Sequence, residues 1–178
     1  MKKQEIKFFK ENEAVFFLKQ IMLGFTALHE NKIMHRDMKL GNIFMNDDTL
    51  FIGDFGLAKS GVDMASTNVG TPLTKAPELS LNQDGCYTSK ADLWSIGICF
   101  YQLLFGDWPF FANSEMELLE DIKRNGGDKL KLPRHINNIS QEAENLLRGL
   151  LVIDPIERIG WNDFFNHPIF KNQDPNQF

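Results

Sequence analysis

The sequence predicts a mainly α-helical fold that contains one short β-hairpin. Three observations favour this fold class: several segments repeat apolar residues at helical spacing, two short apolar runs flank a turn, and one long segment is apolar on nearly all sides. With 178 residues and 43% hydrophobic content, the chain can fill one well-packed core. A single domain is therefore expected.

The first helix is expected from about residue 12 to residue 30, where apolar residues recur at the spacing of an amphipathic helix. These residues are Ala14, Leu18, Ile21, Phe25 and Leu28. The apolar runs 43–45 and 50–52 flank an Asn-Asp-Asp triplet, whose side chains favour turns. This segment predicts a tight antiparallel hairpin, and the aperiodic stretch from about 60 to 73 predicts a long loop.

The second half of the chain predicts four further helices. Residues 91–105 are apolar on nearly all sides, which is typical of a central buried helix, and Thr88 or Ser89 can cap it. Ser114 followed by Glu117 fits a capping box that opens a helix to about residue 124. Ser140 can cap another helix, and a last short one is expected over 161–165.

Charge and composition exclude several classes of function. The net charge is -5 and the basic residues are scattered, which argues against nucleic acid as a partner. The most apolar stretch, 93–105, is too short for a membrane span, and no signal-peptide pattern follows Met1. Cys86 and Cys99 lack metal-binding spacing, so we expect reduced thiols in an intracellular, cytoplasmic protein.

Two polar motifs flank the predicted hairpin: HRDMKLGN at 35–42 and DFG at 54–56. Because the first residue of one strand lies beside the last residue of its antiparallel partner, Asn42 and Asp54 are expected to converge. Asp37 and Lys39 lie just before the same end of the hairpin. Oxygen ligands for a hard cation, a second carboxylate and an ammonium group are the groups that phosphoryl transfer requires.

These motifs belong to an ordered series that resembles the eukaryotic serine/threonine protein kinase family. The series continues with GT at 70–71, APE at 76–78, DLWSIG at 92–97, and DP at 154–155 with Arg158. One such tripeptide alone is more often a structural turn than a site, but six in the family's order leave almost no room for coincidence. The resemblance implies a protein-kinase-like fold. We expect its helical C-terminal lobe over residues 1–170, followed by a tail at 171–178.

The resemblance assigns roles around the hairpin. It implies that Asp37 accepts the proton of the substrate hydroxyl and that Lys39 contacts the transferring phosphate. It also implies that Asn42 and Asp54 hold magnesium and that Phe44 lines the adenine pocket. ATP and Mg²⁺ are therefore the expected cofactors, and protein serine or threonine is the expected phosphate acceptor.

The resemblance also implies a regulatory phosphorylation site and membership of the serine/threonine branch of the family. Thr67 stands where the family carries an activating phosphothreonine, and Arg36 and Lys59 match the cations that bind it. A threonine in a loop needs no function, so the phosphorylation of Thr67 stays an open question. Lys39 and Thr71 resemble the serine/threonine branch.

Four further residues match structural positions of the family. Glu78 and Arg158 match a buried ion pair that ties the activation segment to the C-terminal helices. Asp92 matches a residue that holds the catalytic-loop backbone, and His35 is expected to support the loop by packing. Lys75 departs from the family, which usually has a small or apolar residue there, in the substrate-docking loop.

The printed sequence contains no glycine-rich loop and no strand lysine of the family's N-terminal lobe. We therefore expect half of the ATP site to be absent, the isolated chain to be inactive, and its exposed face to need that lobe or a partner. Two interpretations stay open: the catalytic half of a serine/threonine kinase, and a non-catalytic module that binds kinases or their substrates. The subfamily is open too, since Leu40-Gly41 resembles Polo-like kinases and residues 95–105 and 164–170 resemble autophagy-initiating kinases.

Overall fold

A computed structural model describes residues 8–60, 73–81 and 88–171 of the chain. The fold is mainly helical with a short hairpin, which confirms the predicted class. The α-helices are α1 (Glu11–Glu30), α2 (Glu78–Leu81), α3 (Lys90–Phe105), α4 (Glu115–Asn125), α5 (Gln141–Leu150) and α6 (Trp161–Phe165). Short 3₁₀ turns are η1 (Leu40–Asn42), η2 (Phe55–Leu57), η3 (Gly127–Lys129) and η4 (Pro168–Phe170). None of the helices in the described ranges has the length and apolar character that crossing a membrane requires.

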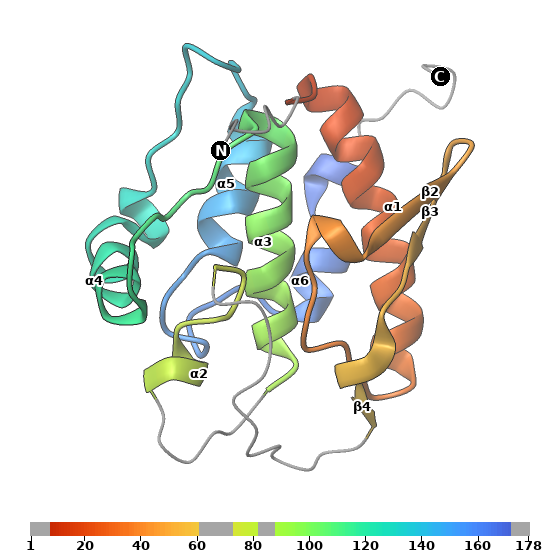
Figure 1. Cartoon of the computed structure of the whole chain (residues 1–178). Helices are drawn as coiled ribbons and strands as arrows, with labels where there is room; N and C mark the ends of the chain where they lie inside the picture. The colour runs from red at the N-terminus through yellow and green to blue at the C-terminus, as the bar shows by residue number, and fades with distance from the viewer. Residues whose placement is uncertain (1–7, 61–72, 82–87, 172–178) are drawn as a thin grey trace.

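Helix α3 runs through the centre of the molecule, with α1 on one side and α5 on the other (Figure 1). Every residue of α3 after Lys90 is buried, as expected for a segment that is apolar nearly all round. The helix ends at Gly106, whose φ of 67° is the left-handed conformation that glycine adopts at low cost. Cys99 lies in this core as a free thiol, and burial raises its pKa to about 12.

Helix α1 uses one face for the core and the other for the hairpin. Its buried residues are Ala14, Val15, Leu18, Ile21, Met22 and Phe25. On the opposite face, the side chain of Gln20 donates to the backbone oxygen of Asp48 at 2.9 Å and accepts from the backbone N–H of Leu50 at 2.8 Å. One amide side chain therefore fixes the hairpin onto α1.

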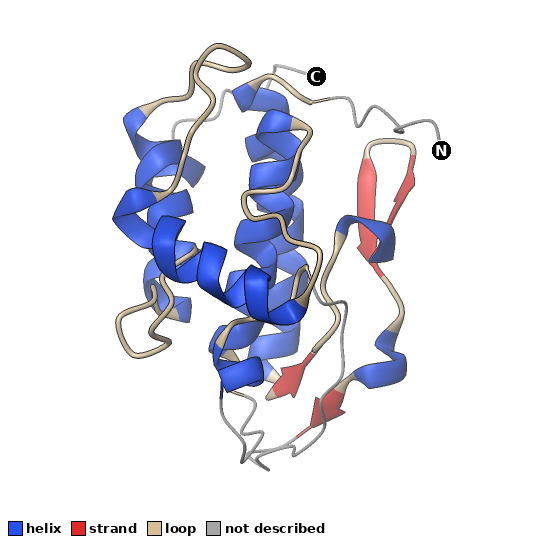
Figure 2. Cartoon of the chain, turned by 60° about the vertical axis from the view of Figure 1, so that its left-hand side comes forward, coloured by secondary structure: helices blue, strands red, loops and turns tan. Residues whose placement is uncertain are grey.

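The strands form two separate antiparallel pairs on one side of the helices (Figure 2). Strands β2 (Ile43–Asn46) and β3 (Thr49–Ile52) form the predicted hairpin, with Ile43 opposite Ile52. Its turn contains Asp47 at a φ of 50°, a conformation that aspartate tolerates better than most residues. Strands β1 (Ile33–Met34) and β4 (Lys59–Ser60) form a second pair that the sequence did not predict.

The helix caps differ from the sequence prediction in two places. Ser89 occupies the N-cap of α3, but its side chain makes no capping hydrogen bond. Ser114 accepts from the backbone N–H of Glu117 at 3.2 Å, whereas the Glu117 carboxylate accepts from Asn113 instead of returning to Ser114. Ser140 caps α5 as predicted, accepting from Ala143 at 3.1 Å.

Candidate active site

Asp92 of helix α3 fixes the backbone of the loop from His35 to Lys39. One carboxylate oxygen of Asp92 accepts the backbone N–H of His35 and the other accepts that of Arg36, each at 2.9 Å. Arg36 has a φ of 71°, which is strained for a residue with a Cβ. Asp92 is buried, so its two hydrogen bonds impose this backbone shape on the loop.

The ring of His35 joins this loop to the residue before Asp54. Its Nδ1 accepts the backbone N–H of Asp37 at 3.3 Å, and its Nε2 lies 3.0 Å from the backbone oxygen of Gly53. These partners assign the proton to Nε2, which donates to the carbonyl. His35 is fully buried and also packs against Phe55, with ring centroids 5.2 Å apart. The structure thus places His35 as a support between the two motifs.

The carboxylate of Asp37 accepts hydrogen bonds from two other side chains of the HRDMKLGN motif. The Oδ2 atom of Asp37 accepts from Lys39 Nζ at 2.6 Å and from Asn42 Nδ2 at 3.2 Å. The same Asn42 nitrogen donates to the backbone oxygen of Asp37 at 2.7 Å. These charge-assisted and amide contacts fix the orientation of the Asp37 carboxylate.

Asn42 and Asp54 lie at the open end of the hairpin. Gly53 donates its backbone N–H to the oxygen of Asn42 at 2.9 Å, which continues the ladder beyond Ile43 and Ile52 by one position. Asp54 comes next, in a left-handed conformation with a φ of 59°. A strained non-glycine residue of this kind is a common feature of functional sites.

The oxygens at this end suit a hard divalent cation. Asn42 uses its nitrogen for both of its side-chain bonds, so its Oδ1 accepts no hydrogen bond from another described residue. The exposed Asp54 carboxylate likewise has no hydrogen bond or ion pair within the described ranges. The described residues hold no cluster of three or more His, Cys, Asp or Glu side chains, so these two groups would form only part of a magnesium shell.

An apolar surface borders these polar groups. Phe44 on β2 is 57% exposed, and a Cβ added to Gly53 would lie 2.6 Å from its ring, so the ring packs against the Gly53 backbone. A cleft of about 470 Å³ lies between α1 and β3, with Leu23, Phe51 and Phe55 among its lining residues. These three side chains are each about half exposed. The sequence analysis missed Gly53, for which a glycine directly after an apolar strand was the available signal.

Of the two residues predicted to bind a phosphothreonine, Arg36 in the HRDMKLGN loop contacts the segment that follows the DFG motif, and Lys59 lies in that segment. Arg36 is buried and donates from Nε to the backbone oxygen of Leu57 at 2.6 Å. Lys59 is exposed on β4, opposite Met34. Thr67 and Thr71 lie outside the described residues, as do Cys86 and most of the predicted loop from 60 to 73.

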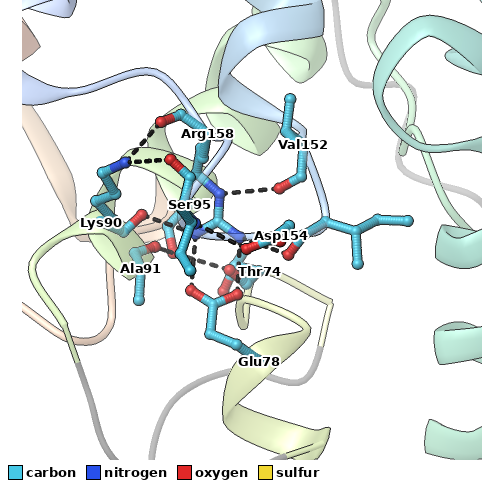
Figure 3. Close-up of polar contacts among 10 residues, drawn as sticks. Thr74, Glu78, Lys90, Ala91, Ser95, Val152, Asp154 and Arg158 are labelled. Carbon is cyan, nitrogen blue, oxygen red and sulfur yellow. Dashed lines mark hydrogen bonds and ion pairs between the residues drawn. The ribbon is translucent and has the colours of Figure 1, made fainter.

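Arg158 and Glu78 form a buried ion pair (Figure 3). The two guanidinium Nη atoms each donate to one carboxylate oxygen at 2.7 Å. Arg158 also donates to the backbone oxygens of Lys90 and Val152, at 2.9 and 3.0 Å, and lies 5.2 Å from the centre of the Trp94 ring. All parts of this guanidinium are therefore engaged, and it links α2, the start of α3 and the segment after α5.

Comparisons with known proteins identify the family of the chain. The sequence profile described as a protein kinase domain matches residues 1–170. The chain belongs to the protein kinase family. Proteins of this family use ATP and Mg²⁺ to phosphorylate protein substrates. The predicted resemblance to serine/threonine kinases is confirmed by the relatives that follow.

The chain is 41% identical over 163 residues to the serine/threonine-protein kinase atg1 of Dictyostelium discoideum, covering 88% of this chain and 23% of that protein. It is 37% identical over 174 residues to ATG1c of Arabidopsis thaliana, covering 94% and 23% of the two chains. It is 39% identical over 164 residues to PLK1 of Xenopus laevis, covering 90% and 26%. The chain thus spans about a quarter of the length of these curated relatives.

Proposed function

We propose that this chain supplies the catalytic and metal-binding residues of an ATP-dependent kinase that phosphorylates serine or threonine in proteins. The observation that carries the proposal is the Asp37 carboxylate, which Lys39 and Asn42 orient through Oδ2. The oxygens of Asn42 and Asp54 lie at the neighbouring open end of the hairpin. This complete set favours an enzyme over a non-catalytic binding module.

Each residue has a task that its surroundings support. Asp37 accepts the proton of the substrate hydroxyl while that oxygen attacks the γ-phosphorus and the bond to ADP breaks. Lys39 places its ammonium group beside the transferring phosphate and offsets its negative charge. Asn42 and Asp54 would hold Mg²⁺, which neutralises charge on the phosphate oxygens when bound. Phe44 would offer its exposed ring to the adenine.

We expect another protein element to cover the apolar surface around Phe44 and the cleft between α1 and β3. We take the cover to be the ATP-binding lobe of the family or a partner that replaces it, because half-exposed aromatic side chains in one region are typical of an interface. We further take Thr67 to be a phosphorylation site read by Arg36 and Lys59, and Thr71 to mark the serine/threonine branch. A reduced Cys99 thiol supports an intracellular, cytoplasmic location.

The test is a radiolabelled-ATP assay on a chimera. The segment of Dictyostelium discoideum atg1 that precedes its matching region is fused before residue 8, and a generic serine/threonine protein serves as substrate. We expect the chimera to be active. We expect Asp37→Asn to lower its rate by at least about 100-fold, because a positioned base contributes about that much or more.

The chain of 178 residues alone is the second arm of this assay. It contains no glycine-rich loop and no strand lysine, so nothing holds the nucleotide from the opposite side. We expect its rate to lie at least about 1,000-fold below that of the chimera, since positioning of reactants can be worth roughly 7–11 kcal/mol. A folded chimera whose rate does not depend on Asp37 would overturn the proposed function.

A further inference from the structure

The segment 123–135, which runs from the last turn of α4 toward α5, concentrates positive charge. It contains five of the 19 Lys and Arg residues of the chain, namely Lys123, Arg124, Lys129, Lys131 and Arg134. Asp128 is its one acidic residue, so five cations and one carboxylate give this segment a charge of +4. The rest of the chain carries -9, because the whole chain carries -5.

Four of these cations are exposed and available to a ligand. Lys123 and Arg124 lie in the last turn of α4, and Lys129 and Lys131 follow the helix. None of the four makes a side-chain hydrogen bond or ion pair with another described residue. Leu130 is only 3% exposed, so it faces the core while the lysines on either side of it face solvent.

The backbone that carries these cations is fixed by the neighbouring helices. Arg148 of α5 donates from Nη1 to the backbone oxygens of Gly127 and Asp128, at 3.2 and 2.6 Å. Tyr101 of α3 donates its hydroxyl to the backbone oxygen of Lys131 at 3.0 Å. A ligand that binds the exposed cations therefore has little backbone freedom to remove, which lowers the entropic cost of binding.

Two links hold the cations of the segment near one another. The N–H of Lys129 donates at 3.3 Å to the backbone oxygen of the residue that follows α4, and Arg124 lies two positions before that residue. Arg134 and Arg148 each pair with one carboxylate oxygen of Glu144, so Glu144 links Arg134 to the arginine that fixes the start of the segment. One carboxylate cannot neutralise two guanidinium groups, so this triad stays positive.

We propose that Arg124, Lys129, Lys131 and Arg134 form a docking surface for a protein segment that carries several Asp or Glu residues. The carboxylates of that segment accept hydrogen bonds from the exposed ammonium and guanidinium groups. The segment between α4 and α5 runs along the outer edge of the molecule, where an extended partner can lie beside it (Figure 1). The inference goes beyond phosphoryl transfer and does not depend on it.

The character of this surface favours a protein segment over a membrane. None of the large apolar side chains that stand exposed in the described ranges lies in 123–135. The surface therefore offers no side chain to insert between lipids, which a membrane-binding surface commonly does. The cations instead follow one another along a stretch of chain, as the carboxylates of an extended acidic segment do.

The experiment measures binding of fluorescein-labelled peptides of about 12 residues to the 178-residue chain by fluorescence anisotropy. One peptide contains a run of about six Glu residues, and its partner contains Gln at the same positions. At low ionic strength we expect the Glu peptide to bind saturably, with a Kd at least about tenfold below that of the Gln peptide. Added salt should weaken this binding, because the contacts lie at an exposed surface.

The double change Lys129→Gln and Lys131→Gln should raise the Kd for the Glu peptide by at least about tenfold, since it removes two exposed ion pairs that each contribute modestly. The matched control is Lys19→Gln with Lys32→Gln. It removes the same charge from α1 and the residues just after it, and α1 lies on the other side of α3 from α5 (Figure 1). Its Kd should stay within about twofold of the parent chain.

Thermal unfolding of each variant checks that it is folded. Equal binding of the Glu and Gln peptides, no saturable binding, or equal effects of the two double changes in folded proteins would overturn the proposal. In the last case the attraction would come from net charge and not from this surface.

Two further measurements test other occupants of the surface. Vesicles of phosphatidylcholine and phosphatidylserine are sedimented with the chain. If the chain binds them but not the Glu peptide, and the change at Lys129 and Lys131 abolishes that binding, the proposal is overturned in favour of a membrane. Sedimentation of the chain alone tests a second copy, since the rest of the chain is acidic. A dimer that the same change dissociates would overturn the proposal in favour of self-association.

Discussion

Gly97 of α3 lies against Leu150 of α5 without room for a side chain between them. A Cβ added to Gly97 would meet the Cβ of Leu150 at 2.8 Å and a methyl carbon of Leu151 at 2.9 Å. Both leucines are fully buried, so they cannot move into solvent. The absence of a side chain at Gly97 therefore sets how closely the two helices approach.

Gly97→Ala is expected to destabilise the protein although alanine favours a helix over glycine by about 1 kcal/mol. Overpacking a filled core typically costs about 1–3 kcal/mol. We expect this cost to exceed the gain in helix propensity, because the buried side chains of Leu150 and Leu151 have no free space to move into. Urea unfolding of the two proteins measures the difference.

Gly149→Ala is the matched control for that change. Its added Cβ would lie 3.6 Å from the nearest carbon of Ile159, which is an ordinary van der Waals contact. We expect it to be neutral or stabilising by up to about 1 kcal/mol. Equal destabilisation by both alanines would show that close helix packing is not the cause.

Removal of either Glu78 or Arg158 alone should cost about 3–5 kcal/mol, because the remaining charge stays buried without its partner. The double change to alanine should cost less than the sum of the two single changes. A double-mutant cycle in urea measures this coupling, and additive effects would contradict it.

The surface pair of Arg134 and Glu144 provides a comparison for the buried pair. The Arg134 side chain is 55% exposed, so the loss of this ion pair in Arg134→Ala should cost no more than about 1 kcal/mol. A cost similar to that of Arg158→Ala would mean that burial does not decide the strength of the Glu78–Arg158 pair.

Asp92→Asn should release the catalytic-loop backbone. Asparagine has one acceptor oxygen and one donor nitrogen, so one of the N–H groups of His35 and Arg36 loses its acceptor, at a cost of about 1–3 kcal/mol. Amide hydrogen exchange at His35 and Arg36 should become faster. Exposed Asp48→Asn is the control, and equal effects of the two changes would refute this role for Asp92.

The unfolding free energy should fall on mild acidification because of His167. Burial lowers the pKa of His167 below its ordinary value of 6.5, and the neutral ring accepts a hydrogen bond from Ile169 through Nδ1 at 3.3 Å. The unfolded chain therefore binds this proton more readily, so stability is retained above pH 6.5 and lost as the pH falls below it. Urea unfolding between about pH 7.5 and about pH 5.5 should show a weaker pH dependence in His167→Asn, and an unchanged slope would contradict the assignment.

The local pattern of the chain was enough to predict the helices and the hairpin, whose pairing places Asn42 opposite Gly53, the residue before Asp54. Apolar spacing determines which face of α1 is buried, and antiparallel pairing of β2 with β3 leaves little choice about which residues share the open end. The order of the motifs then indicated the family. Strands β1 and β4 escaped prediction because two residues each are too few to show a period.

Only the tertiary structure decided which distant residues support the site. The Asp92 carboxylate reaches His35 across 57 positions, and the Glu115 carboxylate reaches Lys75 across 40. Periodicity shows that a residue is buried but not what it is buried against, and the partner depends on how α3 and α4 pack. The same holds for Gly97, since a glycine inside a helix looks unfavourable until Leu150 is found where its side chain would be.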